Sequence, residues 1–359
     1  MAASIKINNR IIGPGHPVYI IAEMSANHGQ NFDEAVRLIN AAKEAGADAI
    51  KLQTYTADTL TIDCDNEYFR IRRGTIWDGR TLYDLYKEAY TPWDWQPKLK
   101  KIANDLELDL FSSPFDHTAI DFLEKMDVPA YKISSFELVE LPLIQHVAKT
   151  GKPVIMSTGM ATLGEIDEAV CAARKAGAKD IALLKCTSAY PALPEEMNLR
   201  TISHMARAFH VPVGLSDHTL GIAVPIAAVS LGASIVEKHL TLSRSIPGPD
   251  STFSLEPEEF KAMAHSIRIV EKALGKVDYT VTEREENSRI FRRSLFITKN
   301  IKAGELFTED NIQSIRPSNG LRPVWRELIL GTRASSDVDR GTPVSWELLL
   351  RREINKNIK

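Results

Sequence analysis

Short apolar runs alternate with longer amphipathic stretches from Val18 to about Gly275, and this alternation constrains the fold more than any other feature. The runs end in polar residues and carry apolar side chains at successive positions, as strands buried on both faces do. They are Val18–Ala22, Ala49–Gln53, Leu110–Ser113, Ala130–Ile133, Pro153–Ser157, Ile181–Lys185, Val213–Leu215 and Ser234–His239.

Helical patterns lie between most of these runs. Their apolar residues recur every three or four positions, and several end at a glycine, which is the usual signature of a helix and its C-terminal cap. The clearest stretches are Phe32–Ala45, Gly164–Ala176, Asn198–Phe209 and Glu256–Leu274.

Eight strand–helix alternations within about 260 residues predict a (β/α)8 barrel, the TIM-barrel fold, whose usual size is about 250 residues. An open, doubly wound sheet is the alternative. No GxGxxG motif follows the first strand, which weakens a dinucleotide-binding version of that sheet.

The pattern changes after Gly275. Tyr279–Arg289 is polar and charged, as a linker is, and Arg293–Glu353 contains short strand-like pieces at Ser294–Thr298 and Val344–Ser345. We therefore predict a barrel domain over 1–278, a linker over 279–292 and a small β-rich domain over 293–359.

The segment Thr54–Thr91 is too long for an ordinary barrel loop, since loops beyond about 12–15 residues are usually functional lids or disordered. It carries many aromatic side chains, among them Tyr68, Trp77 and Tyr86. We interpret it as an ordered lid near the site.

Composition excludes several classes of protein. The chain has 359 residues and a net charge of −3, so it is not a polycation built for nucleic acid or an anionic membrane. No apolar run approaches the roughly 18 residues of a membrane span, and Met1–Ile12 has no hydrophobic signal core. Cys64, Cys171 and Cys186 are scattered without metal spacing, which fits a reducing cytoplasm.

The active site of a (β/α)8 barrel lies at the carboxyl ends of its strands. The polar residues there include lysines, hydroxyls and imidazoles but few carboxylates, which predicts a site for an anion and a metal. They are Glu23, Lys51, Gln53, Ser112, Ser113, Lys132, Ser134, Ser135, Ser157, Thr158, Lys185, Thr187, Ser188, Ser216, Asp217, His218, Glu237, Lys238 and His239.

His218 and His239 end neighbouring strands, so a shared metal is favoured over two ordinary hydrogen-bonded histidines. Lys51 and Lys132 lie in apolar strands, where a charge is costly without a partner, and we expect both to contact a ligand. Lys185 is ambiguous, because a buried lysine can also form a Schiff base. Glu23 is open between a general acid or base, a metal-bridging group and a lysine partner.

Together these residues resemble the sialic acid synthase family over nearly the whole chain. The matching strings include Ile21-Ala22-Glu23, Lys51-Leu52-Gln53, Lys132-Ile133-Ser134-Ser135-Phe136-Glu137, Ser157-Thr158-Gly159-Met160, Cys186-Thr187-Ser188-Ala189-Tyr190-Pro191, Leu215-Ser216-Asp217-His218, Glu237-Lys238-His239 and Gly248-Pro249-Asp250. The tail, with Ile301-Lys302-Ala303-Gly304-Glu305 and Ile315-Arg316-Pro317, resembles that family's antifreeze-like (SAF) domain.

The resemblance implies a transferase that condenses phosphoenolpyruvate with an acetamido-sugar aldehyde and breaks the carbon–oxygen bond of phosphoenolpyruvate. It implies a divalent metal, Mn²⁺ with Mg²⁺ or Co²⁺ as substitutes, bound by His218 and His239, and a domain-swapped homodimer. It assigns catalysis to Glu23, His218 and His239, phosphoenolpyruvate binding to Lys51, Ser113, Lys132, Ser135, Ser157, Ser188 and Ser216, and sugar contacts to Gln53, Glu137, Tyr190, Asp250 and Arg316.

The strings Asp63–Phe69 and Trp77–Tyr90 are most similar to the branch of the family that makes pseudaminic acid. The N-acetylneuraminate and legionaminate branches are the close alternatives. In the N-acetylneuraminate branch we expect Asn where Ser188 stands, although a hydroxyl can also donate to phosphate. Two other hypotheses stay open, a Schiff-base aldolase and a non-catalytic carbohydrate-binding or ice-binding protein.

Overall fold

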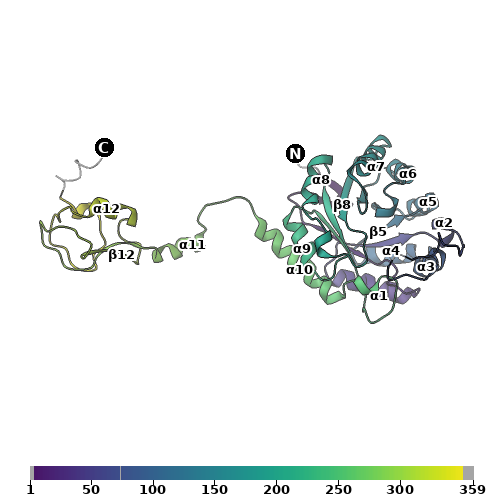
Figure 1. The fold of residues 1–359 in the computed structure, drawn as a ribbon, viewed down its shortest axis with the longest axis horizontal. Coiled ribbons are helices and arrows are strands. Elements are labelled where there is room, and N and C mark those ends of the chain that lie inside the picture. The colour runs from purple at the N-terminus through teal and green to yellow at the C-terminus, as the bar shows by residue number, and fades with distance from the viewer. Residues whose placement is uncertain (1–3, 73, 351–359) are drawn as a thin grey trace. The chain divides into compact units, whose positions relative to one another are not determined.

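Eight parallel strands close into a barrel, in the order β10-β3-β4-β5-β6-β7-β8-β9 (Figure 1). The computed structural model describes residues 4–72 and 74–350. The predicted (β/α)8 fold is therefore confirmed, and the open sheet is wrong. The strands are β3 (Tyr19–Glu23), β4 (Ala49–Thr54), β5 (Asp109–Pro114), β6 (Tyr131–Ile133), β7 (Val154–Ser157), β8 (Ile181–Cys186), β9 (Val213–Asp217) and β10 (Ile235–His239).

Helices surround this barrel and bury one apolar stripe each. In the first of them the Asn31 side chain caps the N-terminus, and Ala35, Leu38, Ile39 and Ala42 form the buried face. The helices are α1 (Phe32–Glu44), α4 (Gln96–Asp105), α5 (His117–Lys125), α6 (Leu141–Lys149), α7 (Leu163–Lys175), α8 (Thr201–Phe209), α9 (Ala223–Ser230) and α10 (Pro257–Leu274).

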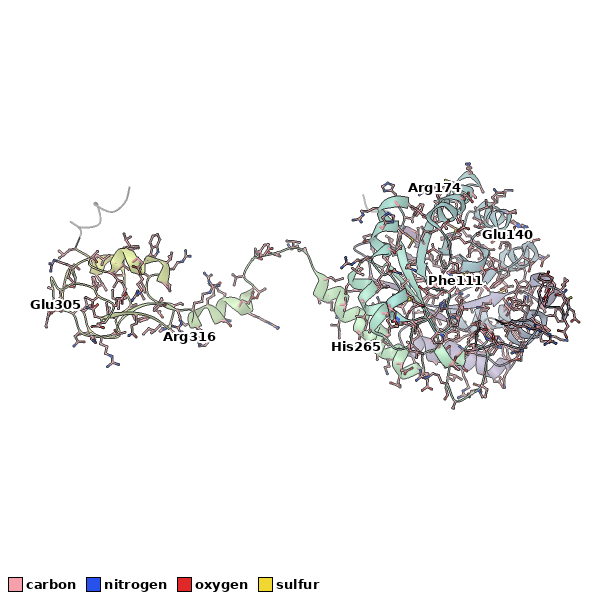
Figure 2. The ribbon with its side chains drawn as sticks, in the orientation of Figure 1. Phe111, Glu140, Arg174, His265, Glu305 and Arg316 are labelled. Carbon is pink, nitrogen blue, oxygen red and sulfur yellow. The ribbon has the colours of Figure 1, made fainter. Side chains whose placement is uncertain are left out.

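The strands are buried on both faces, which explains their continuous apolar runs. Phe111 on β5 is completely buried (Figure 2). Two apolar clusters of buried side chains hold the strands and helices together. Burial of this apolar surface is the main source of stability for such a core.

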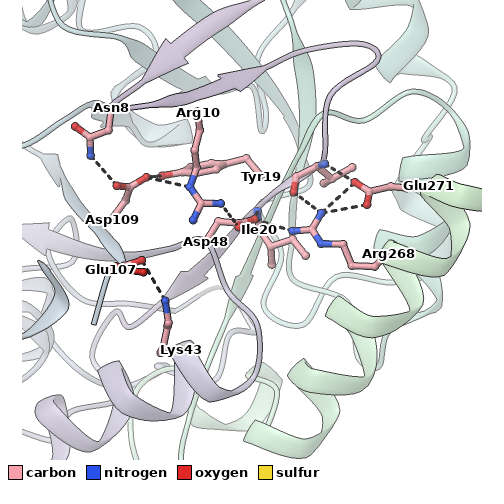
Figure 3. A network of polar contacts seen from close by, with 11 residues as sticks. Asn8, Arg10, Tyr19, Ile20, Lys43, Asp48, Glu107, Asp109, Arg268 and Glu271 are labelled. Carbon is pink, nitrogen blue, oxygen red and sulfur yellow. Dashed lines mark hydrogen bonds and ion pairs between the residues drawn. The ribbon is translucent and has the colours of Figure 1, made fainter. Parts of the chain in front are cut away.

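A hairpin and a polar network close the amino-terminal end of the barrel (Figure 3). The hairpin pairs β1 (Ile5–Ile7) with β2 (Arg10–Ile12). Ile5, Ile7 and Ile12 are buried. Tyr19 Oη donates to Asp109 Oδ2 at 2.7 Å, and Arg268 from α10 pairs with Asp48 at 2.8 Å. These contacts cover the amino-terminal end of the barrel, and the site is expected at the opposite end.

The segment after β4 is an ordered insertion that holds two helices, α2 (Ala57–Leu60) and α3 (Leu82–Ala89), which lie beside one another (Figure 1). Between them the chain folds back on itself through an antiparallel bridge of Arg70 with Thr81. The predicted ordered lid is therefore present, although its two helices were not predicted. Thr81 caps α3 by accepting from the backbone of Asp84.

The chain divides into two compact units, Met1–Gly275 and Lys276–Lys359. The second contains α11 (Glu283–Ser288), β11 (Ser294–Ile297), β12 (Ile312–Ile315) and α12 (Arg326–Ile329), with a small core of its own. The predicted strand at Ser294–Thr298 is confirmed, whereas at Val344–Ser345 the chain only flanks an isolated bridge of Pro343 with Phe296.

The segment expected to be a linker contains α11, because Thr282 caps that helix in a capping box with Glu285. The exact domain boundaries stay a prediction, and residues 351–359 of the third segment lie outside the described residues. None of the helices within 4–72 and 74–350 combines the length and apolar character that a membrane crossing requires.

Candidate active site

The carboxyl ends of the strands open into a cavity of about 340 Å³, within the range of about 300–1,000 Å³ typical of small-molecule sites. Its walls come from the strand ends and from the insertion after β4. Most of the side chains nominated by the sequence line this cavity. They are Glu23, Lys51, Gln53, Lys132, Ser135, Glu137, Ser157, Tyr190, Ser216, His218, His239 and Asp250.

Ser113 and Ser188 do not line the cavity themselves but contact residues that do. Ser113 Oγ accepts a hydrogen bond from Lys51 Nζ at 3.3 Å, and Ser188 Oγ lies 3.8 Å from Cys186 Sγ. Arg316 belongs to the second unit, where its side chain is exposed (Figure 2). Its part in the site stays a prediction.

Two buried lysines share one carboxylate at the floor of the cavity. Lys51 Nζ lies 3.7 Å and Lys132 Nζ lies 3.5 Å from Glu237 Oε1. Burial lowers the pKa of Lys132. Burial also opposes the charge of Lys51, but the neighbouring carboxylates outweigh it and raise the pKa of that lysine. Two cations so deeply buried form a strong site for an anion that carries several negative oxygens.

Glu237 was listed among the polar strand ends, but sequence reasoning gave it no role in the site. Its Oε1 accepts from Ser216 Oγ at 3.2 Å, and its buried Oε2 has no hydrogen-bond partner within the described structure. Burial would raise the pKa of Glu237, but Lys132 and Lys51 more than offset this and lower it. The alternation of side chains along a strand could have identified it, because residues two apart share one face. Glu237 and His239 both line the cavity, whereas Lys238 between them is buried against Asp217.

Glu23, the last residue of β3, has the properties of a proton carrier. Its Oε2 lies 2.6 Å from Lys51 Nζ, and its Oε1 accepts from Gln53 Nε2 at 3.0 Å. Burial raises the pKa of Glu23 to about 7, although Lys51 opposes the shift. A carboxyl group with a pKa near 7 can both take and return a proton at neutral pH.

A cluster of hydroxyls surrounds Gly159, after β7. Gly159 N donates to Ser135 Oγ at 3.1 Å, and a Cβ on this residue would lie 2.2 Å from Ser188 Oγ and 2.7 Å from Ser135 Oγ. Ser157 Oγ, which also faces the cavity, is buried and has no hydrogen-bond partner in the described structure. Short donors around a glycine, beside two lysines, match what a phosphate group requires.

The imidazoles of His218 and His239 lie side by side, with ring centroids 5.4 Å apart. Phe253, from the loop after β10, packs edge-on against both rings. His218 Nδ1 lies 3.0 Å from the carbonyl oxygen of Thr187, which can fix the ring and its tautomer. His239 Nδ1 is buried without a hydrogen-bond partner in the described structure, and burial with the nearby cations lowers the pKa of His239 well below its usual value.

This pair fits a divalent metal. A neutral imidazole keeps the lone pair that a metal needs, and a buried nitrogen without a partner is costly unless something binds it. No set of three or more His, Cys, Asp or Glu side chains within residues 4–72 and 74–350 has the arrangement of a metal site. A metal on the two imidazoles would take its other ligands from water and substrate.

The remaining predicted sugar contacts of the barrel also line the cavity. Ser25 Oγ donates to Asp250 Oδ2 and accepts from Gln53 Nε2 at 2.9 Å. Ser25 thus links Gln53 to Asp250, two of the predicted sugar contacts. Burial raises the pKa of Glu137 to about 7, and its Oε2 has no hydrogen-bond partner in the described structure. The ring of Tyr190 lies 4.5 Å from that of His218.

Lys185 does not line the cavity. Its Nζ donates to the carbonyl oxygen of Cys186 at 2.7 Å, although burial lowers the pKa of this half-buried lysine. The geometry therefore gives no support to Lys185 as a Schiff-base residue.

Comparison with known families decides what this barrel is. The NeuB family matches residues 38–279, and the SAF domain matches residues 292–350. The chain belongs to the NeuB family. The catalytic unit of this NeuB-family protein is thus the barrel that carries the lysine pair and the imidazole pair.

Relatives of known name cover almost the whole chain. It is 46% identical to a pseudaminic acid synthase of Campylobacter jejuni subsp. jejuni, covering 90% of this chain and 94% of that one. It is 44% identical to a pseudaminic acid synthase of Helicobacter pylori, covering 92% and 97%. Its fold matches the crystal structure of N-acetylneuraminic acid synthetase from Leptospira borgpetersenii with a TM-score of 0.72 at 31% identity, covering 80% and 95%.

Proposed function

We propose that this chain is a pseudaminic acid synthase. It condenses phosphoenolpyruvate with 2,4-diacetamido-2,4,6-trideoxy-L-altrose and water, and it releases pseudaminic acid and phosphate. The observation that carries the proposal is the buried Lys51–Glu237–Lys132 group beside the imidazole pair in a single cavity. The identity to two pseudaminic acid synthases over at least nine-tenths of the chain supports this acceptor over those of N-acetylneuraminate and legionaminate synthases.

Phosphoenolpyruvate would bind across the lysines and the hydroxyl cluster. Its phosphate would accept from Ser135, Ser157 and Ser188 around Gly159, while Lys51 and Lys132 would neutralise its charge. Ser113 would hold Lys51 in place, and Ser216 would hold Glu237. The two lysines would then exchange part of their pairing with Glu237 for pairing with the ligand.

His218 and His239 would hold the divalent metal, for which we take Mn²⁺ first and Mg²⁺ or Co²⁺ as substitutes. When bound, the metal supplies a Lewis acid that polarises the acceptor aldehyde. Phe253 packs against both rings and limits their rotation, so the pair is preorganised before substrate arrives.

The proposed reaction makes one carbon–carbon bond and breaks one carbon–oxygen bond. The methylene carbon of phosphoenolpyruvate bonds to the aldehyde carbon, whose oxygen takes up a proton. Water adds to the former enol carbon and loses one proton, which balances the proton taken up by the aldehyde oxygen. The hydroxyl so formed then gives its second proton to the departing phosphate as the bond between that carbon and the phosphate oxygen breaks, and a ketone remains. Glu23 would accept the proton of the water, and its pKa of about 7 suits this transfer.

Gln53, Glu137, Tyr190 and Asp250 would bind the acceptor. All four line the cavity, and Ser25 ties Gln53 to Asp250. The Glu137 oxygen without a partner would accept from a sugar N–H or O–H.

A second copy of the chain would complete the site. We infer a domain-swapped homodimer in which Arg316 of one copy reaches the acetamido group bound in the other. Exposed apolar side chains stand around the mouth of the barrel, among them Phe136 (58% exposed), Met160 (61%) and Leu220 (63%), as an interface of that kind requires. We further infer that the enzyme works in the cytoplasm and supplies sugar for flagellin glycosylation or cell-surface polysaccharide.

Complementation tests the swap. A mixture of Arg316→Ala chains with Lys51→Ala chains, co-expressed to form heterodimers, contains one site with both residues intact. Recovery of activity is the expected result. Verified heterodimers without activity would refute the swap but leave the reaction untouched.

An acceptor panel tests the function. Phosphate release from phosphoenolpyruvate with Mn²⁺ is measured with 2,4-diacetamido-2,4,6-trideoxy-L-altrose, N-acetylmannosamine and the legionaminate precursor in parallel. We expect fastest release with the first and none after EDTA. Release only with one of the others would move the chain to that branch. Borohydride trapping of pyruvate on the protein would favour a Schiff-base aldolase instead, and sugar binding without release would favour a carbohydrate-binding protein.

A further inference from the structure

We propose that the insertion after β4 carries an apolar subsite for the methyl terminus of the acceptor and thereby selects a 6-deoxy sugar over its 6-hydroxy counterpart. This inference rests on the proposed function and names the part of the site that sets its specificity. The subsite, called here the apolar wall, consists of Leu60, Ile71, Leu82, Leu85 and Ala89.

One face of α3 supplies most of the wall. Leu82, Leu85 and Ala89 lie at positions i, i+3 and i+7 of the helix, so their side chains share one face, and all three line the cavity. Lys87 and Glu88, on the other side of the same helix, are exposed. The helix therefore presents an apolar face to the cavity and a charged face to solvent.

The wall is not part of the barrel's ordinary core. Leu85 is 7% exposed and Ala89 is 9% exposed, yet neither belongs to the two apolar clusters that hold the strands and helices together. The same is true of Leu60, Ile71 and Leu82 in the described structure. Packing of the barrel does not explain these side chains, whereas the cavity that they line does.

Contacts on two sides fix the wall in place. The ring of Tyr55 packs edge-on against those of Tyr86 on α3 and Phe115 after β5. At the other side Trp77 Nε1 donates to the carbonyl oxygen of Pro249 at 2.9 Å, and its ring lies 5.4 Å from that of Tyr190. Trp77 thus joins the insertion to the loop after β8, the strand opposite β4 in the barrel, and to the loop after β10.

The polar strand ends and the apolar wall together orient the acceptor. The reacting aldehyde must lie at the polar strand ends, beside the imidazoles and the lysines. The opposite end of the open sugar chain then meets the apolar wall, whose five side chains have no hydrogen-bonding group, with Tyr55 and Tyr86 also lining the cavity. A methyl group can be buried there, whereas a hydroxymethyl group loses its water without gaining a partner. A pocket of this kind discriminates roughly 10- to 100-fold against an added hydroxyl.

The test compares kcat/KM for 2,4-diacetamido-2,4,6-trideoxy-L-altrose with that for its 6-hydroxy counterpart, measured as phosphate release. We expect the full-length enzyme to prefer the 6-deoxy sugar by roughly 10- to 100-fold. Leu85→Asn, of similar shape but polar, is expected to reduce this ratio at least fivefold. Leu85→Met, which stays apolar, is expected to keep it. Lys87→Asn places the same new side chain on the exposed face of α3 and is expected to change nothing.

Leu82→Asn, at a less buried position of the wall, repeats the test if Leu85→Asn fails to fold. Equal kcat/KM of the unaltered enzyme for both sugars would overturn the inference and leave the proposed function standing. An unchanged ratio in a folded wall variant would also overturn it. No phosphate release with any acceptor would overturn the proposed function itself.

Discussion

Replacement of Gly159 by alanine tests the phosphate cradle with the smallest available change. Gly159 has no left-handed backbone angle, so alanine is tolerated by the main chain. Its new Cβ would lie 2.2 Å from Ser188 Oγ and 2.7 Å from Ser135 Oγ, whereas ordinary contacts are 3.4–4 Å. Both hydroxyls must therefore move away, by about 1 Å in the tighter case, and the bond from Gly159 N to Ser135 Oγ is disturbed.

The loss can be estimated from the bonds that the hydroxyls would make. A hydrogen bond to a charged group contributes about 1.5–3 kcal/mol. Displacement of both hydroxyls would thus cost about 3–6 kcal/mol of binding to phosphoenolpyruvate, or roughly 10²- to 10⁴-fold in kcat/KM for this substrate. KM for the acceptor should change far less, because neither displaced hydroxyl is among the proposed acceptor contacts Gln53, Glu137, Tyr190 and Asp250.

The assay is steady-state phosphate release at varied phosphoenolpyruvate, with thermal unfolding measured beside it. Gly164→Ala is the matched control, since its Cβ would meet only Thr162 Oγ1, at 3.9 Å, and it lies in helix α7. Alanine there should keep full activity and add about 0.5–1 kcal/mol of stability. A Gly159→Ala enzyme with unaltered kcat/KM for phosphoenolpyruvate would refute the cradle.

Three further changes test separate groups of the site. Glu23→Gln should lower kcat by roughly 10²- to 10⁴-fold. It should also remove the fall in activity below about pH 7 that the pKa of Glu23 predicts. A pH–rate profile of the variant that still falls below pH 7 would contradict this role. Burial raises the pKa of Glu137 from 4.5 to about 7. Between pH 4.5 and pH 7 the folded state therefore keeps a proton on Glu137 that the unfolded state has lost. The contribution of Glu137 to the free energy of unfolding thus falls as pH rises through this window. Glu137→Gln should therefore stabilise the protein above pH 7 by about 3 kcal/mol but not at pH 4, and Glu168→Gln on the exposed face of α7 should not. Chemical unfolding at both pH values measures this, and an equal gain at pH 4 would contradict it. His239→Ala should weaken Mn²⁺ binding roughly tenfold or more, followed by the electron paramagnetic resonance of free Mn²⁺, and unaltered affinity would exclude His239 as a ligand.

Much of the barrel could be predicted from the sequence because its strands are buried on both faces. Runs such as Ala49–Gln53 and Ser234–His239 match β4 and β10 closely, and their polar last residues reach the cavity. Period and length suffice for such segments, since helices cover every strand and no face of the sheet meets water.

The sequence was less informative where tertiary contacts decide the outcome. The polar segment after Gly275 contains α11 because of a capping box, a local signal that composition hides. Val344–Ser345 has strand-like residues but only flanks an isolated bridge, since the short second unit has few partners for strands. Glu237 received no role because its lysine partners come from other strands, although strand alternation places it on the same face as His239.

The central claim is that the cavity joins phosphoenolpyruvate to an acetamido sugar with cleavage of a carbon–oxygen bond. The most direct measurement uses phosphoenolpyruvate labelled with ¹⁸O in its bridging oxygen, together with 2,4-diacetamido-2,4,6-trideoxy-L-altrose and Mn²⁺, and follows the label by mass spectrometry of the released phosphate. We predict that the phosphate carries the full label and that its amount equals that of the sugar acid formed. Unlabelled phosphate would place the cleavage at phosphorus, and unconsumed phosphoenolpyruvate would show that the cavity serves another chemistry.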